Sequence, residues 1–168
     1  MKTIVTTLGL CLTLVAAALT GWVFAADQST VCLELADKAE DFIHEKGKEY
    51  ALKVFSASKG PFIDKEMYVF ACSMDGKLLA HPYRRDIVGQ DVNNLTDSKG
   101  KPIFREFQKV AQQKGTGWVS YWWTKPGEQR EFSKTTYIKR IPDYNIYIGV
   151  GYYKPVQYSQ NANRPDAN

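Results

Sequence analysis

The sequence has few of the residues on which enzymes and metal sites depend. Its 168 residues include two histidines, His44 and His81, and three cysteines. Neither histidine belongs to a Ser-His-Asp or Cys-His arrangement of known context. The sequence contains no Cys-x-x-Cys, His-x-x-x-His or Cys-x-x-Cys-His pattern, so neither a metal site nor a haem site is indicated. We therefore expect a protein that is not an enzyme and that has no metal or other cofactor.

A strong excess of charge of one sign is also missing. The 22 basic and 18 acidic residues give a net charge of +4, and opposite charges are mixed along the chain, as at Arg84, Arg85 and Asp86. Nucleic-acid-binding proteins usually gather their basic residues on one surface. We therefore expect no nucleic-acid partner.

One long apolar run is present, and it lies at the N-terminus. A lysine precedes an almost wholly apolar stretch over residues 8–19, and Val23 and Ala25 then form a small-x-small site. This order is typical of a secretory signal peptide, so we expect residues 1–25 to be removed and the mature protein to lie in the periplasm. The alternative is an uncleaved anchor that faces the periplasm, since the run approaches the roughly 20 residues of a membrane-spanning helix.

Cleavage after Ala25 leaves 143 residues, which is enough for one domain with a single core. It also leaves Cys32 and Cys72, an even pair that invites a disulfide in an oxidising compartment. Cys32 lies on the apolar stripe of a predicted helix and Cys72 in a predicted strand, so both could face one core. The alternative is two buried free thiols. Both interpretations stay open because the sequence does not reveal the Cα separation.

Hydrophobic periodicity predicts an α+β domain. Apolar residues recur at helical spacing over residues 29–56, where Gly47 can bend or divide the helix, and again over residues 101–114, which include Phe104 and Phe107. An Asp-Gly turn joins the first two β-prone runs. The predicted strands cover residues 67–73, 78–81, 118–124, 132–140 and 144–153. The polar segment 82–101 is predicted to be a long loop, and such loops usually carry function.

Short motifs in this pattern resemble the single Cache domain family of bacterial extracytoplasmic sensors, and the resemblance covers residues 29–153. In chain order they are Tyr68-Val69-Phe70, Asp75-Gly76, Ala80-His81-Pro82, Val88-Gly89, Asp97 with Gly100-Lys101, Gly115-Thr116-Gly117-Trp118-Val119-x-Tyr121-x-Trp123, Lys134-x-x-Tyr137 and Ile148-Gly149-x-Gly151. The resemblance implies a long N-terminal helix packed on a PAS-like antiparallel sheet of five to six strands. It predicts a sensor domain over residues 26–154, followed by a flexible polar tail over residues 155–168.

Members of this family commonly bind short-chain carboxylates such as acetate, propionate, pyruvate or lactate, in a pocket between the sheet and the loop-helix segment. They usually form the outer part of a chemoreceptor or histidine kinase. The resemblance therefore implies a sensor for a two- to three-carbon organic acid. Because this sequence stops after the domain, we expect a freestanding module with a membrane-bound receptor or kinase as partner. The alternative is a structural or protein-interaction module whose pocket is filled by side chains.

Aromatic and cationic side chains in the matching motifs are the candidates for the ligand site. A buried carboxylate needs a cation and hydrogen-bond donors, because an unpaired buried charge is costly. Lys134 could supply the cation, with help from His81 or from an arginine at 84 or 85. The candidates are Tyr68, Phe70, His81, Arg85, Trp118, Tyr121, Trp123, Lys134 and Tyr137.

Each candidate also has a structural interpretation. The aromatic residues could be core, Lys134 a solvated strand residue, His81 a support for the following loop, and the arginines surface charges. Strict strand alternation places Lys134 and Tyr137 on opposite faces, so both reach one ligand only if a bulge intervenes. A homodimer through the N-terminal helix is a further expectation for the assembled protein.

Overall fold

The computed structural model describes residues 27–155. The expected cleavage after Ala25 and the expected flexibility of the tail therefore lie outside the described residues. Between residues 27 and 155, no helix is both long enough and apolar enough to cross a membrane.

The predicted N-terminal helix is present as two helices, α1 (Gln28–Lys46) and α2 (Lys48–Phe55). Gly47 separates them with a φ of 84°, a backbone conformation that residues other than glycine rarely adopt. Of the two effects expected at this glycine, a bend or a division, the structure shows the division. Three of the five buried α1 residues are alanine or cysteine, which lets the helix approach the sheet closely. The buried residues of α1 are Cys32, Leu35, Ala36, Ala39 and Ile43.

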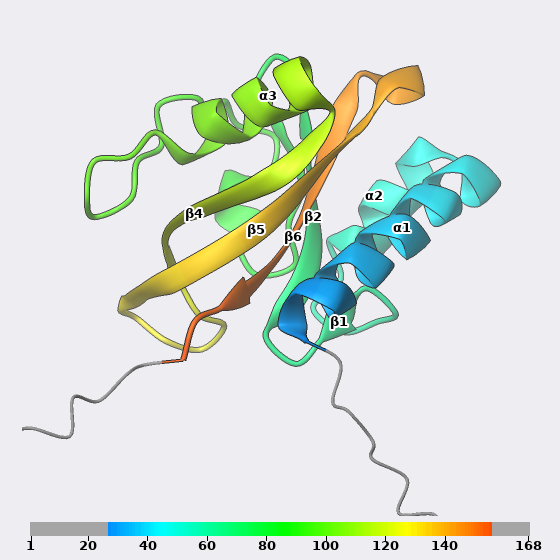
Figure 1. The fold of residues 1–168 in the computed structure, drawn as a ribbon. Helices are drawn as coiled ribbons and strands as arrows, with labels where there is room; N and C mark the ends of the chain where they lie inside the picture. Colours follow the sequence, from blue (N-terminus) through cyan, green and yellow to red (C-terminus); the bar gives the residue numbers. More distant parts are fainter. Residues whose placement is uncertain (1–26, 156–168) are drawn as a thin grey trace, which may run out of the picture.

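Six antiparallel strands form one sheet in the order β1-β2-β6-β5-β4, and β3 pairs with β2 (Figure 1). The strands are β1 (Ile63–Asp64), β2 (Met67–Ser73), β3 (Leu78–Ala80), β4 (Thr116–Thr124), β5 (Glu131–Ile141) and β6 (Ile146–Tyr153). The first long strand therefore lies beside the last one. The predicted α+β class, with a long N-terminal helix on an antiparallel sheet, is confirmed.

The two faces of the sheet are covered by different parts of the chain (Figure 1). Helices α1 and α2 pack on one face, which we call the helix face. Helix α3 (Ile103–Lys114) and the preceding loop pack on the other, which we call the site face. Alternation along each central strand sends side chains to both faces in turn. Along β6, for example, Ile148 and Val150 belong to the helix-face core, whereas Tyr147 and Tyr153 belong to the site-face core.

The two cysteines lie on opposite faces of the sheet. Cys32 packs in the helix-face core, and Cys72 packs in the site-face core. Both are free and fully buried, and burial raises the pKa of each thiol to about 12. The expectation that both face one core is therefore wrong. Of the two interpretations left open, the structure shows the buried free thiols and not the disulfide.

Asp97 holds the long loop in place and thereby positions α3. Its Oδ1 accepts backbone N–H bonds from Lys99 and Lys101, and its Oδ2 accepts one from Trp122 in β4 at 3.0 Å. Burial opposes the charge of Asp97, but these hydrogen bonds outweigh burial and lower its pKa. The Nζ atom of Lys101 also donates to the carbonyl of Ser120, at 2.6 Å. These bonds fasten the loop to the edge of the sheet, directly before α3 begins.

Candidate functional site

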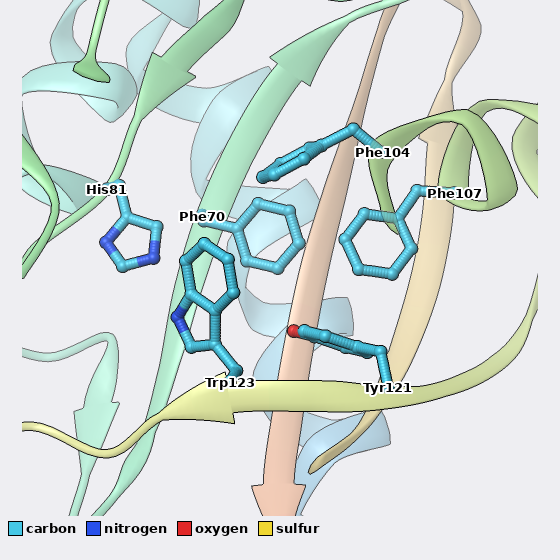
Figure 2. A pocket seen from close by; sticks show the side chains of 6 residues that line it. All are labelled: Phe70, His81, Phe104, Phe107, Tyr121 and Trp123. Atoms are coloured by element: carbon cyan, nitrogen blue, oxygen red, sulfur yellow. The ribbon is translucent and has the colours of Figure 1, made fainter. Parts of the chain in front are cut away.

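A small aromatic cavity lies between the site face and α3 (Figure 2). Phe104 and Phe107 enter it from α3, His81 faces them from the opposite side, and β4 supplies two further rings. The cavity leaves about 10 Å³ for the centre of a water molecule, which is close to the lower limit for holding one water. Its lining residues are Phe70, His81, Phe104, Phe107, Tyr121 and Trp123. We call it the inner cavity.

Two glycines of β6 clear the floor beneath this cavity. Gly149 and Gly151 alternate along β6 with residues of the helix face, so a side chain at either position would point to the site face. A Cβ atom at Gly149 would overlap the Phe70 ring, and one at Gly151 would overlap the Thr136 hydroxyl and approach Cε of Lys134 at 2.8 Å. Glycine at these positions therefore lets the Phe70 ring and the Lys134 stem lie directly on the sheet.

Lys134 is a fully buried cation on this floor. In register it stands between Tyr121 of β4 and Tyr153 of β6. Its Nζ atom lies 3.7 Å from the ring centroid of Tyr68 and 4.7 Å from that of Tyr153. No side chain or backbone group of residues 27–155 accepts a hydrogen bond from this atom. Burial lowers the Lys134 pKa from 10.5 to about 7.

His81 is neutral and offers one N–H donor. Its Nδ1 atom accepts backbone N–H bonds from Tyr83 at 3.1 Å and Arg84 at 3.0 Å, so the proton belongs on Nε2. Burial, followed by the nearby charges of Lys134 and Arg84, lowers the His81 pKa to about 3. The histidine therefore holds the following loop, as one of the two interpretations expected, and still lines the inner cavity.

Two tyrosines connect these groups. Tyr68 stacks against Lys134 on one side and lies 4.9 Å, centroid to centroid, from the His81 ring. The Tyr121 hydroxyl is 3.0 Å from the Thr136 hydroxyl, which lies next to the Lys134 stem. Burial raises the pKa of both phenols well above 10, so both remain neutral hydrogen-bonding groups. Lys134, Tyr68 and His81 are thus neighbours in contact, and of these three His81 lines the inner cavity.

The two neighbouring arginines point to different places. Arg85 donates to the backbone carbonyl of Ser56 at the end of α2, away from the inner cavity. The Arg84 guanidinium instead lies 5.6 Å from the Trp123 ring and binds Asp86. Arg84 also lines a second cavity of about 170 Å³, the outer cavity, to which Tyr68 and Trp123 contribute. Of the pair named from the sequence, Arg84 is therefore the one placed near the site.

Trp118 and Tyr137 lie on the helix face and not in the cavity. The β5–β6 register runs from Lys134 to Ile141 without a bulge, so Tyr137 points away from Lys134. Its ring packs 5.2 Å from that of Trp118, which is 39% exposed. These two of the candidates named from the sequence therefore do not line the inner cavity, because strand alternation is unbroken here. The remaining candidates, Tyr68, Phe70, His81, Tyr121, Trp123 and Lys134, all lie on the site face.

Phe104 and Phe107 line the cavity but were not among the candidates named from the sequence. Both belong to the apolar stripe of the predicted helix, a pattern that indicates core packing equally well. These residues could be identified as cavity residues because their side chains lie opposite the aromatic face of β4. The sequence alone does not show this, since it does not reveal that α3 covers that face.

An antiparallel sheet with α1 and α2 on one face, and with α3 and a buried lysine among aromatic rings on the other, defines an α+β domain with a candidate ligand site. The chain belongs to the Cache domain family, which it matches over residues 30–156. The predicted resemblance is therefore confirmed, and the protein is a Cache sensor domain.

Solved structures with the same fold include three that are described as chemotaxis proteins or chemosensory domains. One is a periplasmic sensor domain of a chemotaxis protein, with 22% identity and a TM-score of 0.62 over 74% of this chain and 88% of that chain. Another is a Cache chemosensory domain described for its carboxylic acid recognition, with 23% identity and a TM-score of 0.61 over 74% and 86%. A methyl-accepting chemotaxis protein from Vibrio parahaemolyticus RIMD 2210633 has 17% identity and a TM-score of 0.59 over 74% and 82%.

Proposed function

We propose that this protein is an extracytoplasmic sensor domain for a small organic acid of two or three carbons, such as acetate, propionate, pyruvate or lactate. The observation that carries the proposal is Lys134, a fully buried cation without a hydrogen-bond acceptor among residues 27–155. A buried unpaired cation is unfavourable unless an anion or another acceptor meets it. A ligand carboxylate supplies that partner.

In this proposal the carboxylate binds beside Trp123, which lines both cavities, and beside Tyr68, which contacts both Lys134 and His81. Lys134 contributes the charge, while Nε2–H of His81 and the Tyr68 hydroxyl contribute neutral donors. The apolar end of the acid enters the inner cavity. The outer cavity, with Arg84 at its rim, is the entrance for the anion.

The proposal agrees with the carboxylic acid recognition described for one Cache domain of the same fold. We place the mature protein in the periplasm, with a membrane-bound receptor or kinase as its signalling partner. A membrane-anchored form facing the periplasm is the alternative location. A homodimer through α1 remains part of the same proposal.

A structural or interaction module is the second candidate function. The observation in its favour is the size of the inner cavity, whose rings leave room for about one water. An acid whose apolar end is larger than a water molecule must therefore move these rings apart, whereas an interaction module needs no such movement.

Thermal-shift screening separates the two functions. A ligand that binds only the folded protein raises the melting temperature, and the shift grows with ligand concentration. We expect at least one of the four acids to raise the melting temperature, whereas sodium chloride at equal ionic strength should not. Equal melting temperatures with every acid and with the salt would favour the interaction module.

A further inference from the structure

A third cavity lies at the end of the sheet where β4 connects to β5 and where β6 ends (Figure 1). It has a volume of about 310 Å³, and it shares no lining residue with the inner cavity. Trp122 and Ser133, which lie opposite each other in the β4–β5 register, both line it. Because Tyr121 and Trp123 point to the site face, strand alternation directs Trp122 to the opposite face. We call this space the hairpin cavity, and no residue of α1 or α2 lines it.

Two cations line the hairpin cavity without an acidic partner. Arg130 and Lys154 are both exposed, and neither belongs to an ion pair among residues 27–155. The acidic residue of the lining, Glu131, accepts a backbone N–H bond from Ser98 at 3.1 Å. Two cations and one acid give the lining a net charge of +1. Electrostatic complementarity therefore favours an anion as the occupant of this cavity.

The remaining lining is aromatic or apolar. Trp122 is 37% exposed, which makes it one of the few large apolar side chains among residues 27–155 that the core does not bury. The Arg130 guanidinium lies 4.5 Å from the ring centroid of Phe132, which also lines the cavity. Aromatic side chains favour other rings in stacked or edge-on contact. Because an apolar cavity of about 150 Å³ can hold benzene, the hairpin cavity has room for one aromatic ring with a carboxylate.

We propose that the hairpin cavity is a second ligand site, which binds a small aromatic carboxylate such as benzoate or phenylacetate. The ring of the ligand stacks on Trp122, and its carboxylate bonds to Arg130 and Lys154. A guanidinium presents paired N–H donors that suit a carboxylate, and an ammonium adds a second positive charge. This site is additional to the one around Lys134 and does not depend on it. Both sites use β4, whose residues alternate between the two cavities.

Titration of the unmodified protein with benzoate, followed by NMR, locates the ligand. The indole N–H signals of Trp122 and Trp123 report on the hairpin cavity and the inner cavity respectively. We expect benzoate to shift the Trp122 signal to saturation and to shift the Trp123 signal less. A larger shift at Trp123, or no saturable shift at either, would overturn the proposal.

Two analogues of benzoate separate its charge from its ring. Benzamide keeps the ring and lacks the charge, whereas cyclohexanecarboxylate keeps the charge and lacks the aromatic ring. Each should bind about fivefold more weakly than benzoate, because each loses one of the two kinds of contact. Binding of either analogue as tight as that of benzoate would overturn the proposed ligand class.

Substitutions of exposed side chains identify the residues responsible without disturbing the core. Arg130→Gln and Lys154→Gln should each weaken benzoate binding about fivefold, and Trp122→Leu should weaken it about tenfold. The matched controls are Lys114→Gln, at an exposed cation of α3, and Trp118→Leu, at an exposed tryptophan of β4 outside the cavity. Both controls should bind benzoate like the unmodified protein. An equal loss in a variant and its control would overturn the proposal, because the effect would then not be local.

Lys134→Met separates this inference from the proposed function. Lys134 lies on the site face, so this variant should bind benzoate like the unmodified protein. Loss of benzoate binding in Lys134→Met together with normal binding in Arg130→Gln would place the aromatic acid near Lys134 and overturn the inference, while leaving the proposed function intact. Benzoate binding in a protein that binds none of the short acids would support the inference and contradict the proposed function.

Discussion

The two faces of the sheet are built from the same strands, but their chemistry differs. The helix face is filled with aliphatic and small side chains of α1, such as Ala36, Ala39 and Ile43. The site face buries aromatic rings together with Lys134, His81 and Thr136. Among the described residues, the buried side-chain atoms without a hydrogen-bond partner belong to Lys134, Arg140 and Tyr147. Two of these three, Lys134 and Tyr147, are fully buried on the site face.

This difference indicates that the helix face mainly stabilises the fold and that the site face mainly serves binding. Apolar burial stabilises a fold in proportion to the area removed from water, and the helix face provides it without buried charge. A buried cation opposes folding, and such groups are typical of binding sites. Substitutions on the helix face should therefore change stability and spare binding, while substitutions on the site face should change binding, whether or not they also change stability.

The largest effect on stability is expected from Phe55→Ala on the helix face. Phe55 is nearly fully buried and packs edge-on against Phe62, with 4.7 Å between ring centroids. Removing such a ring costs about 3–5 kcal/mol of unfolding free energy. Urea unfolding should measure this loss, while calorimetry should find unchanged acid affinity in the folded fraction. A loss of acid affinity greater than tenfold would contradict the inference that substitutions on the helix face spare binding.

A smaller loss of stability, about 1–3 kcal/mol, is expected from Gly151→Ala. The added methyl group overlaps the Thr136 hydroxyl and pushes the Lys134 stem off the sheet. Acid affinity should therefore also fall, because the cation moves. The matched control is Gly117→Ala in β4, whose added methyl meets only a Val110 methyl group. Normal acid binding by Gly151→Ala would show that the position of Lys134 is not critical.

The pH dependence of binding and of stability should run in opposite directions above neutrality. Burial lowers the Lys134 pKa to about 7, so acid affinity should be constant below pH 7 and fall up to tenfold per pH unit above it. The unfolded chain binds a proton at Lys134 up to its ordinary pKa of 10.5. The contribution of Lys134 to the unfolding free energy should therefore rise between about pH 7 and 10.5.

Calorimetry across pH 6 to 9 measures the first effect, and urea unfolding over the same range measures the second. In the Lys134→Met variant, the fall in acid affinity above pH 7 and the rise in unfolding free energy between about pH 7 and 10.5 that Lys134 causes should both be absent. An affinity that stays constant up to pH 9 would contradict a neutralising role for this lysine.

The smallest effect is expected from Tyr137→Phe. Tyr137 lies half-buried on the helix face, where its ring contacts Trp118. Removing its hydroxyl should leave acid affinity unchanged and alter the unfolding free energy by no more than about 0.5 kcal/mol. A tenfold loss of affinity in calorimetry would instead return Tyr137 to the ligand site.

Periodicity predicted the elements well because both helices and the long strands are strongly patterned. The strand over residues 67–73 has the predicted bounds, and Gly47 divides the first helix as expected. Three short elements were missed: β1, with two residues, and the 3-10 helices η1 (Arg85–Ile87) inside the long loop and η2 (Pro142–Tyr144) before β6. None of them is long enough to show a period.

The site was predicted in part because alternation assigns residues to faces but does not say which helix covers each face. It separates Lys134 from Tyr137 correctly, and the family motif that joined them misplaced Tyr137. The same limit explains the cysteines, since Cys72 and α1 lie on opposite sides of the sheet. It also explains why Phe107 went unrecognised as a cavity residue.

The most direct test of the account compares Lys134→Met with Lys139→Met by calorimetric titration with acetate, propionate, pyruvate and lactate. Lys139 lies on the same strand but faces α1, where it pairs with Asp37 at 2.6 Å. Losing a charged partner in a buried site costs roughly 2–5 kcal/mol, so Lys134→Met should bind the acid more than tenfold more weakly. Lys139→Met should bind it like the unmodified protein. Unmodified affinity in a folded Lys134→Met protein would contradict the account.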